Sequence, residues 1–197
     1  MEKITSYIKK HWFVIASTIV VCAAVALIEY WSGRSLLGPD GMFGWWDGNI
    51  WGNENSQRVA DIYSFSHIIH GIVFYGFLFW VARKLPLKYR FLIALLVEGG
   101  WELLENSSII IDRYREATIA QGYVGDSVLN STCDVLMMVI GFIVAKFSRI
   151  WLTILLIIAF ELGTLYIVRD NLALNILMLV SPVESVKQWQ AEGNILK

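Results

Sequence analysis

Long apolar runs are the feature that most constrains this chain. Five segments are apolar for about 17 to 25 residues and are bounded by charge, Gly or Pro, and an α-helix of this length can cross a hydrocarbon core of roughly 30 Å. The chain is 56% hydrophobic and 17% charged, which is too apolar for an ordinary soluble domain. We therefore predict an all-α, polytopic transmembrane helical bundle with about five spanning helices. The predicted spans are approximately 11–30, 62–82, 90–108, 124–146 and 150–168.

The remaining segments are predicted to lie at the membrane surface. A chain of 197 residues is short enough to form a single integral membrane domain over 1–197. Segment 32–60 places Trp and Phe among glycines and polar residues, a composition that suits the headgroup level, so we predict a long outer loop. The apolar stretch 171–180 is too short to span. We predict that the C-terminal segment 171–197 forms an interfacial helix followed by a polar tail.

Lys and Arg gather in segments that a five-helix chain places on one side of a membrane. Basic residues precede the first span, lie between the second and third spans, and separate the fourth span from the fifth, where Lys146 and Arg149 stand. Such residues favour the cytoplasmic side, which predicts a cytoplasmic N-terminus and a C-terminus on the outer side. The formal net charge of -1 gives no electrostatic footprint for nucleic acid, so the expected partner is membrane lipid.

Three consecutive predicted spans each carry polar residues on one face. The members of each set are three or four residues apart, which places them on one side of a helix. With a rise of about 1.5 Å per residue, the three sets share a level in the outer half of the bilayer. A charged residue at the bilayer centre costs about 2.5 to 3.5 kcal/mol on insertion scales, so a common explanation is needed. The sets are His67 and His70, then Glu98, Glu102 and Glu105, then Asp126, Asn130 and Asp134.

These polar sets admit three interpretations. They could bond to one another as a structural network between helices. Two histidines with carboxylates could also bind a divalent metal such as Zn, Fe or Mn, and the candidate ligands are then His67, His70, Glu98 and Glu102. Without a metal, a histidine beside a buried carboxylate could act as a general acid or base. The candidate catalytic residues are His67, His70, Glu102, Glu105, Asp126, Asn130 and Asp134.

The segment between the third and fourth spans holds two arginines that could bind substrate. Arg113 and Arg115 lie among Asp112 and Glu116 on the predicted outer side. A guanidinium can hold a phosphate or carboxylate through two hydrogen bonds, so either residue could hold a lipid headgroup over the site. Ordinary ion pairing with the neighbouring acids is the alternative.

Four stretches of the chain resemble a known family: SHIIHGIVFYG, VEGGWELLEN, GYVGDSVLNSTCDVLMMVIG and RDNLALNILML. Together they resemble an uncharacterised family of bacterial inner-membrane proteins, classed as a domain of unknown function. The order of His, Glu, Arg and an Asp/Asn stripe ending in Gly is more distantly similar to the VanZ-like proteins associated with teicoplanin resistance. Two histidines and three glutamates leave that correspondence open. The matching residues are His67 or His70, Glu102 or Glu105, Arg115, Asp126, Asn130, Asp134 and Gly141.

The resemblance implies a multi-pass protein of the bacterial inner membrane, with its C-terminus in the periplasm and a role in the cell envelope. Combined with the polar sets, it favours an intramembrane His/carboxylate site near the outer leaflet that acts on a lipid or lipid-linked substrate. A proton- or ion-coupled transporter would use the same residues as a relay. A non-catalytic envelope or resistance factor would use them as a structural network. The sequence predicts no oligomeric state.

Overall fold

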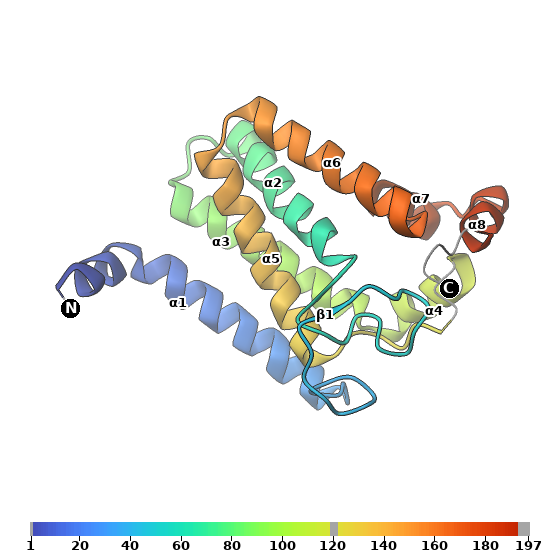
Figure 1. Cartoon of the computed structure of the whole chain (residues 1–197). Helices are drawn as coiled ribbons and strands as arrows, with labels where there is room; N and C mark the ends of the chain where they lie inside the picture. The colour runs from blue at the N-terminus through green and yellow to red at the C-terminus, as the bar shows by residue number, and fades with distance from the viewer. Residues whose placement is uncertain (1, 119–121, 193–197) are drawn as a thin grey trace.

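The computed structural model describes residues 2–118 and 122–192, with side chains from His11 onward, so Lys3, Lys9 and Lys10 lie outside the described side chains. The described chain is almost entirely helical, which confirms the all-α bundle (Figure 1). One short parallel pair of strands, β1 (Trp46–Asp47) and β2 (Ala60–Asp61), interrupts it. The helices are α1 (Glu2–Trp31), α2 (Ser64–Val81), α3 (Leu87–Glu105), α4 (Ser108–Ala117), α5 (Val128–Phe147), α6 (Ile150–Val168), α7 (Leu172–Val180) and α8 (Glu184–Ala191).

Four helices are long and apolar enough to cross a membrane: His11–Trp31 within α1, and α2, α5 and α6. Helix α6 has the bounds that the sequence predicted. Helix α3 is also long, at 19 residues, but its charged side chains exclude it from this group. It nevertheless packs against α1, α2 and α5. Its Glu98 and Glu102 side chains are fully buried against these helices.

Two predicted boundaries are wrong, each for a local reason. The fourth span was expected from residue 124, but α5 begins at Val128. Gly125 has φ +90°, which right-handed helix does not allow, and the Ser127 side chain caps α5 by accepting a hydrogen bond from the Asn130 N–H. Asp126 consequently precedes the helix and does not share a helical stripe with Asn130. At the C-terminus, α8 forms where a polar tail was expected, and residues 193–197 lie outside the described residues.

Glycines bring the backbones of α2 and α5 into direct contact. A Cβ added to Gly71 would lie 2.0 Å from the Met138 carbonyl oxygen, and one added to Gly141 would lie 2.0 Å from that of Ile68. Small residues at a helix interface allow this close approach. His67 stands one helical turn before Gly71, so the approach determines how near its ring comes to α5.

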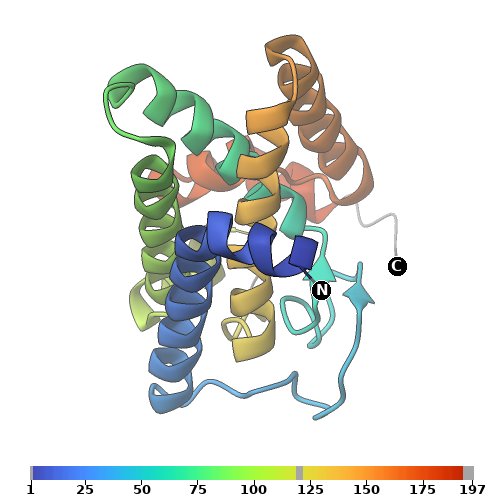
Figure 2. The same cartoon turned by 90° about the vertical axis from the view of Figure 1, so that its left-hand side faces the viewer.

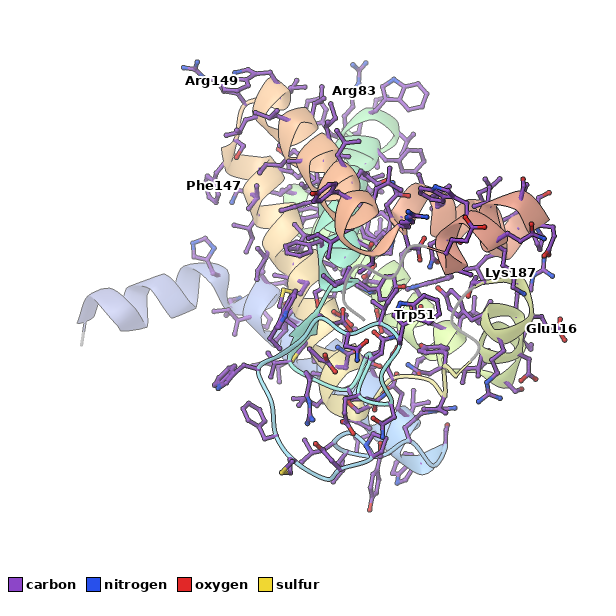
Figure 3. The ribbon with its side chains drawn as sticks, turned by 45° about the vertical axis from the view of Figure 1, so that its right-hand side comes forward. Trp51, Arg83, Glu116, Phe147, Arg149 and Lys187 are labelled. Carbon is purple, nitrogen blue, oxygen red and sulfur yellow. The ribbon has the colours of Figure 1, made fainter. Side chains whose placement is uncertain are left out.

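The two ends of the bundle differ in composition. Arg83 and Arg149, in the α2–α3 and α5–α6 turns, lie together at one end (Figure 3). Loop 32–60 lies at the opposite end (Figure 2). There the carbonyls of Ser35, Leu36 and Ser56 accept hydrogen bonds from the backbone N–H groups of residues 127–129. The loop thereby satisfies donors that the first turn of a helix leaves unpaired.

An apolar core fills the bundle between the basic turns and the polar residues. It joins four helices, and its residues are nearly inaccessible to solvent, with Leu95, Val135 and Met138 at 0% exposure. The polar sets lie on the loop side of this core. Its buried members are Val21, Val25, Leu78, Phe91, Ala94, Leu95, Val135, Met138 and Phe142.

We predict that Gly71→Ala lowers the free energy of unfolding by about 1 to 3 kcal/mol, because the new methyl group would collide with α5 backbone. Gly76→Ala is the matched control on the same helix, where an added Cβ meets nothing within 4 Å. It should be neutral or stabilising, since Ala favours helix over Gly. Thermal or denaturant unfolding in detergent measures both. Equal stability of the two variants would contradict the close packing of α2 against α5.

Candidate functional site

His67 is the point at which the three polar sets meet. Its Nδ1 lies 2.7 Å from Glu98 Oε1 and 3.2 Å from Glu102 Oε1, both on α3. Its Nε2 lies 3.9 Å from Asp134 Oδ2 on α5. All four side chains are buried. The structure therefore brings together one predicted residue set from each of three helices.

His70 adds a partly exposed imidazole to this cluster. Its Nδ1 lies 3.1 Å from Glu98 Oε2 and 3.2 Å from Oε1, so the Glu98 carboxylate is shared between two imidazoles. The His70 ring stacks on Phe74 with a centroid distance of 5.8 Å. His67, His70 and Glu98 can each offer a ligand atom within 4.8 Å of the others, and so can His67, Glu102 and Glu105. These residues could hold a metal ion.

A second group of polar side chains surrounds Asn106. Its Nδ2 lies 3.0 Å from Glu29 Oε1, 3.1 Å from Asp126 Oδ2 and 2.9 Å from Ser131 Oγ. Its Oδ1 accepts a hydrogen bond from the Asp126 N–H at 2.6 Å. One amide thus connects α1, α3 and the start of α5. Asn106 and Glu29 were not predicted as site residues, although a glutamate in the apolar first span was an available signal.

Two tyrosines hydrogen-bond to carboxylates on the loop side of the cluster. Tyr114 donates a hydrogen bond to Glu105 Oε1 at 2.9 Å, and Tyr123 donates one to Asp126 Oδ1 at 2.8 Å. Burial raises the pKa of the Asp126 carboxyl to about 6, against the opposing effect of the Tyr123 hydrogen bond. Asp126 is therefore half protonated near pH 6, about one pH unit below neutrality, and is mostly ionised at pH 7.

Asp170, directly after α6, is a further buried carboxylate that the sequence did not single out. Its Oδ2 accepts a hydrogen bond from Tyr63 at 3.2 Å, and its Oδ1 accepts one from Gln190 of α8 at 3.0 Å. Burial raises the pKa of Asp170 to about 6. The contact with Gln190 ties the C-terminal helices to the loop side of the bundle.

A cavity of about 460 Å³ opens beside these groups, between α2, α3, α4, α5 and α7, with Asn55 and Ser56 of the outer loop in its wall. Its lining combines polar and apolar side chains. Among the described residues that line it, none is Lys or Arg. The polar residues include His67, His70, Glu98, Glu105, Asp126, Asn130, Asp134 and Asp170, and the apolar residues include Val73, Phe74, Val97, Trp101, Ile176 and Leu179.

The two arginines predicted to bind substrate lie outside this cavity lining. Arg113 Nε donates a hydrogen bond to the Leu179 carbonyl at 2.8 Å, which ties α4 to α7. Arg115 Nε donates one to the Tyr123 carbonyl at 2.6 Å, and Arg115 Nη1 lies 3.6 Å from Asp112. Both guanidinium groups thus contact the chain itself, as the ion-pairing alternative for Arg115 expected. Asn130 does line the cavity, and its Nδ2 donates to the Arg58 carbonyl.

Comparison with known proteins places the chain in a family. A family profile described as "Protein of unknown function (DUF2585)" matches residues 29–192, which include every residue of the cluster and the cavity. The chain belongs to this family. The DUF2585 assignment confirms the predicted resemblance to an uncharacterised family, whereas the VanZ-like similarity stays a prediction.

Relatives of similar length share nearly half of their residues or more with this DUF2585 protein. A UPF0314 protein of Sphingopyxis alaskensis is 53% identical over 182 residues, which cover 92% of this chain and 95% of the relative. UPF0314 proteins of Rhizobium etli and Paracoccus denitrificans are 48% and 46% identical, covering 92% and 89% of this chain and 92% and 91% of their own. No solved structure matches the chain.

We predict a pH dependence of stability that originates at Asp170. Its folded pKa of about 6 exceeds the ordinary value of 3.8, so ionisation costs the folded state more than the unfolded state. The contribution to stability is fully present below about pH 3.8 and is lost as the pH rises through about 6. By linkage the loss is about 3 kcal/mol. Asp170→Asn should remove it.

The measurement is the unfolding free energy of wild type and Asp170→Asn in detergent between pH 4 and 7. The difference between the two proteins should change with pH in favour of the variant. Asp112→Asn, at a side chain that is 65% exposed, is the control and should follow the wild type. Parallel curves for wild type and Asp170→Asn would show that the Asp170 pKa is not raised.

Proposed function

We propose that this protein is a multi-pass protein of the bacterial inner membrane that binds a lipid or lipid-linked molecule and exchanges a proton with its head group. The observation that carries the proposal is the cavity lining, which combines apolar side chains with imidazoles and carboxylates. A lipid likewise combines apolar chains with a polar head group. Sites for small molecules are typically apolar with a few well-placed polar groups, and this cavity follows that pattern.

The apolar part of the cavity lining continues onto the outer surface of the bundle. Val73, Val97 and Ile176 line the cavity and are also 48%, 51% and 53% exposed. In a membrane, apolar side chains on this surface would contact acyl chains. A lipid could therefore enter sideways between α2, α3 and α7, with its chains remaining at the protein surface and its head group inside.

The charge of the lining favours a head group that donates hydrogen bonds. Five carboxylates and two imidazoles face the cavity, and the part of the lining that the structure describes contains no Lys or Arg. A phosphate would meet like charge, whereas a hydroxyl or an amine would find acceptors in Glu105 and Asp126. This replaces the expectation that Arg113 or Arg115 holds an anionic head group.

His70 is the residue best placed to exchange the proton. Glu98 engages Nδ1 and thereby orients the ring, as a carboxylate does behind many functional histidines. Among the described residues, nothing hydrogen-bonds to His70 Nε2, and the ring lines the cavity. Nε2 can accept a hydrogen bond from a hydroxyl bound there. Glu105 and Asp126 also line the cavity.

The bundle ends support an orientation for this site. Basic turns favour the cytoplasm, which places Arg83 and Arg149 inside, the cavity near the outer leaflet, the N-terminus in the cytoplasm and the C-terminus in the periplasm. The apolar core lies between the polar cluster and the basic turns. Within the described residues it leaves no polar path to the cytoplasmic end, which favours a lipid site over a transporter.

The test uses purified protein in nanodiscs and two lipids that share acyl chains and differ in head group. Diacylglycerol, which carries a hydroxyl, should bind at least about tenfold more tightly than phosphatidic acid, which carries a phosphate, because like-charge contacts cost more than about 1.4 kcal/mol. Native mass spectrometry measures both. Tighter binding of phosphatidic acid, or binding of neither, would contradict the proposal.

A pair of variants locates the binding. Val97→Trp should obstruct the cavity and weaken diacylglycerol binding, whereas Leu96→Trp should not. Leu96 is the neighbouring residue, is 55% exposed, and does not line the cavity. Both variants add the same side chain to the same turn of α3. Equal binding by the two would show that the lipid lies elsewhere.

A further inference from the structure

We infer that one divalent metal cation binds beside the cavity, held by His67, His70, Glu98 and Glu102. These residues come from α2 and α3, whose facing sides present two ligands each. The inference does not depend on the lipid proposal, because it concerns the charge and the unpaired atoms of the cluster itself.

The donor atoms form two groups that share His67: those of His67, His70 and Glu98 lie within 4.8 Å of one another, and so do those of His67, Glu102 and Glu105. His67 Nδ1 lies 2.7 Å from Glu98 Oε1 and 3.2 Å from Glu102 Oε1, and His70 Nδ1 lies 3.1 Å from Glu98 Oε2. Ligands that each lie about 2.0 to 2.2 Å from a tetrahedral ion are roughly 3.3 to 3.5 Å apart. To bind one ion with all four residues, the Glu102 side chain would rotate toward His70 and Glu98, and the contact between His67 and Glu98 would lengthen.

Glu102 provides an independent indication of a missing partner. The residue is 0% exposed, and neither carboxylate oxygen accepts a hydrogen bond. Its one ion pair among the described residues is with His67, with 3.2 Å between Oε1 and Nδ1, and that nitrogen already hydrogen-bonds to Glu98. Buried polar atoms are almost always paired, and an unpaired buried carboxylate is among the most costly of them. A cation beside Oε1 would satisfy this group.

The excess of carboxylates around the two histidines also favours a bound cation. Within the described chain, the ion pairs of Glu98, Glu102 and Asp134 are made to His67 and His70 alone. Two imidazoles cannot neutralise three carboxylates. A divalent cation held by neutral imidazoles would supply two positive charges without requiring either histidine to be protonated. Asp134, which accepts a hydrogen bond from Ser64 at 3.1 Å, would then orient the His67 ring from behind.

The donor types narrow the choice of metal. Two imidazole nitrogens with two carboxylates suit Zn²⁺, Fe²⁺ or Mn²⁺, whereas Ca²⁺ and Mg²⁺ prefer sets made only of oxygen. Neither cysteine belongs to a candidate ligand group among the described residues. The alternative account of the same cluster is a set of carboxylates neutralised by protons, and the experiment separates the two.

The experiment loads chelator-treated, detergent-purified protein with Zn²⁺ or Mn²⁺, removes free ions by gel filtration and counts the metal per chain by mass spectrometry. Titration calorimetry gives the affinity. Wild type should retain one ion per chain. His70→Asn and Glu102→Gln should each weaken binding by at least about tenfold, since loss of a supporting residue alone costs that much in other sites.

Glu29→Gln is the matched control, because Glu29 is also a buried glutamate of the bundle but belongs to no candidate ligand group. It should bind metal as the wild type does. Gel filtration and thermal unfolding establish which variants fold, and His70, with a side chain that is 18% exposed, tolerates substitution best. Failure of the wild type to retain either ion, or equal binding by His70→Asn and wild type, would overturn the inference. Loss of metal with diacylglycerol binding intact would leave the lipid proposal standing.

Discussion

The contact between His67 and the carboxylates of α3 and α5 is the interaction on which the rest of this structure depends. Charged groups in the middle of an apolar bundle are tolerated when they meet one another. Glu98 and Glu102 of α3 and Asp134 of α5 share one imidazole as their common neighbour. The glycine contact between α2 and α5 lets that imidazole come close to α5. Register, packing distance and the location of the site are therefore set together.

A second polar connection completes the cavity on the loop side. The Asn106 side chain hydrogen-bonds to Glu29 of α1, to Asp126 just before α5 and to Ser131 within α5. Carbonyl groups of loop 32–60 accept hydrogen bonds from the first turn of α5. The cavity lies between these contacts and the His67 cluster. Its polar lining is thus built from groups that already serve the fold, and the same carboxylates remain accessible to a ligand. Structure and proposed function use one set of residues.

The sequence indicated the helices and the main cluster because both depend on local spacing. The length of the apolar run predicted both ends of α6. Spacings of three and four residues predicted that His67 and His70 share one face of their helix and that Glu98 and Glu102 share one face of theirs, and these faces meet in the structure. Contacts across long stretches of chain left no such pattern. Asn106 reaches Glu29 over 77 positions, and Tyr63 reaches Asp170 over 107. Asp126 was predicted to lie within a helix. The positive φ of Gly125 delays the start of α5 to Val128, about one turn later than the spacing suggests.

A double-mutant cycle on His67 and Glu98 tests the central claim most directly. Unfolding free energies would be measured in detergent with chelator for His67→Leu, Glu98→Met, the double variant and the wild type. Each single change removes one contact of a buried partner, so each should destabilise, and the double variant should lose at least about 1 kcal/mol less than the two losses combined. Losses that simply add would show that the two residues do not interact, and that the bundle does not depend on their contact.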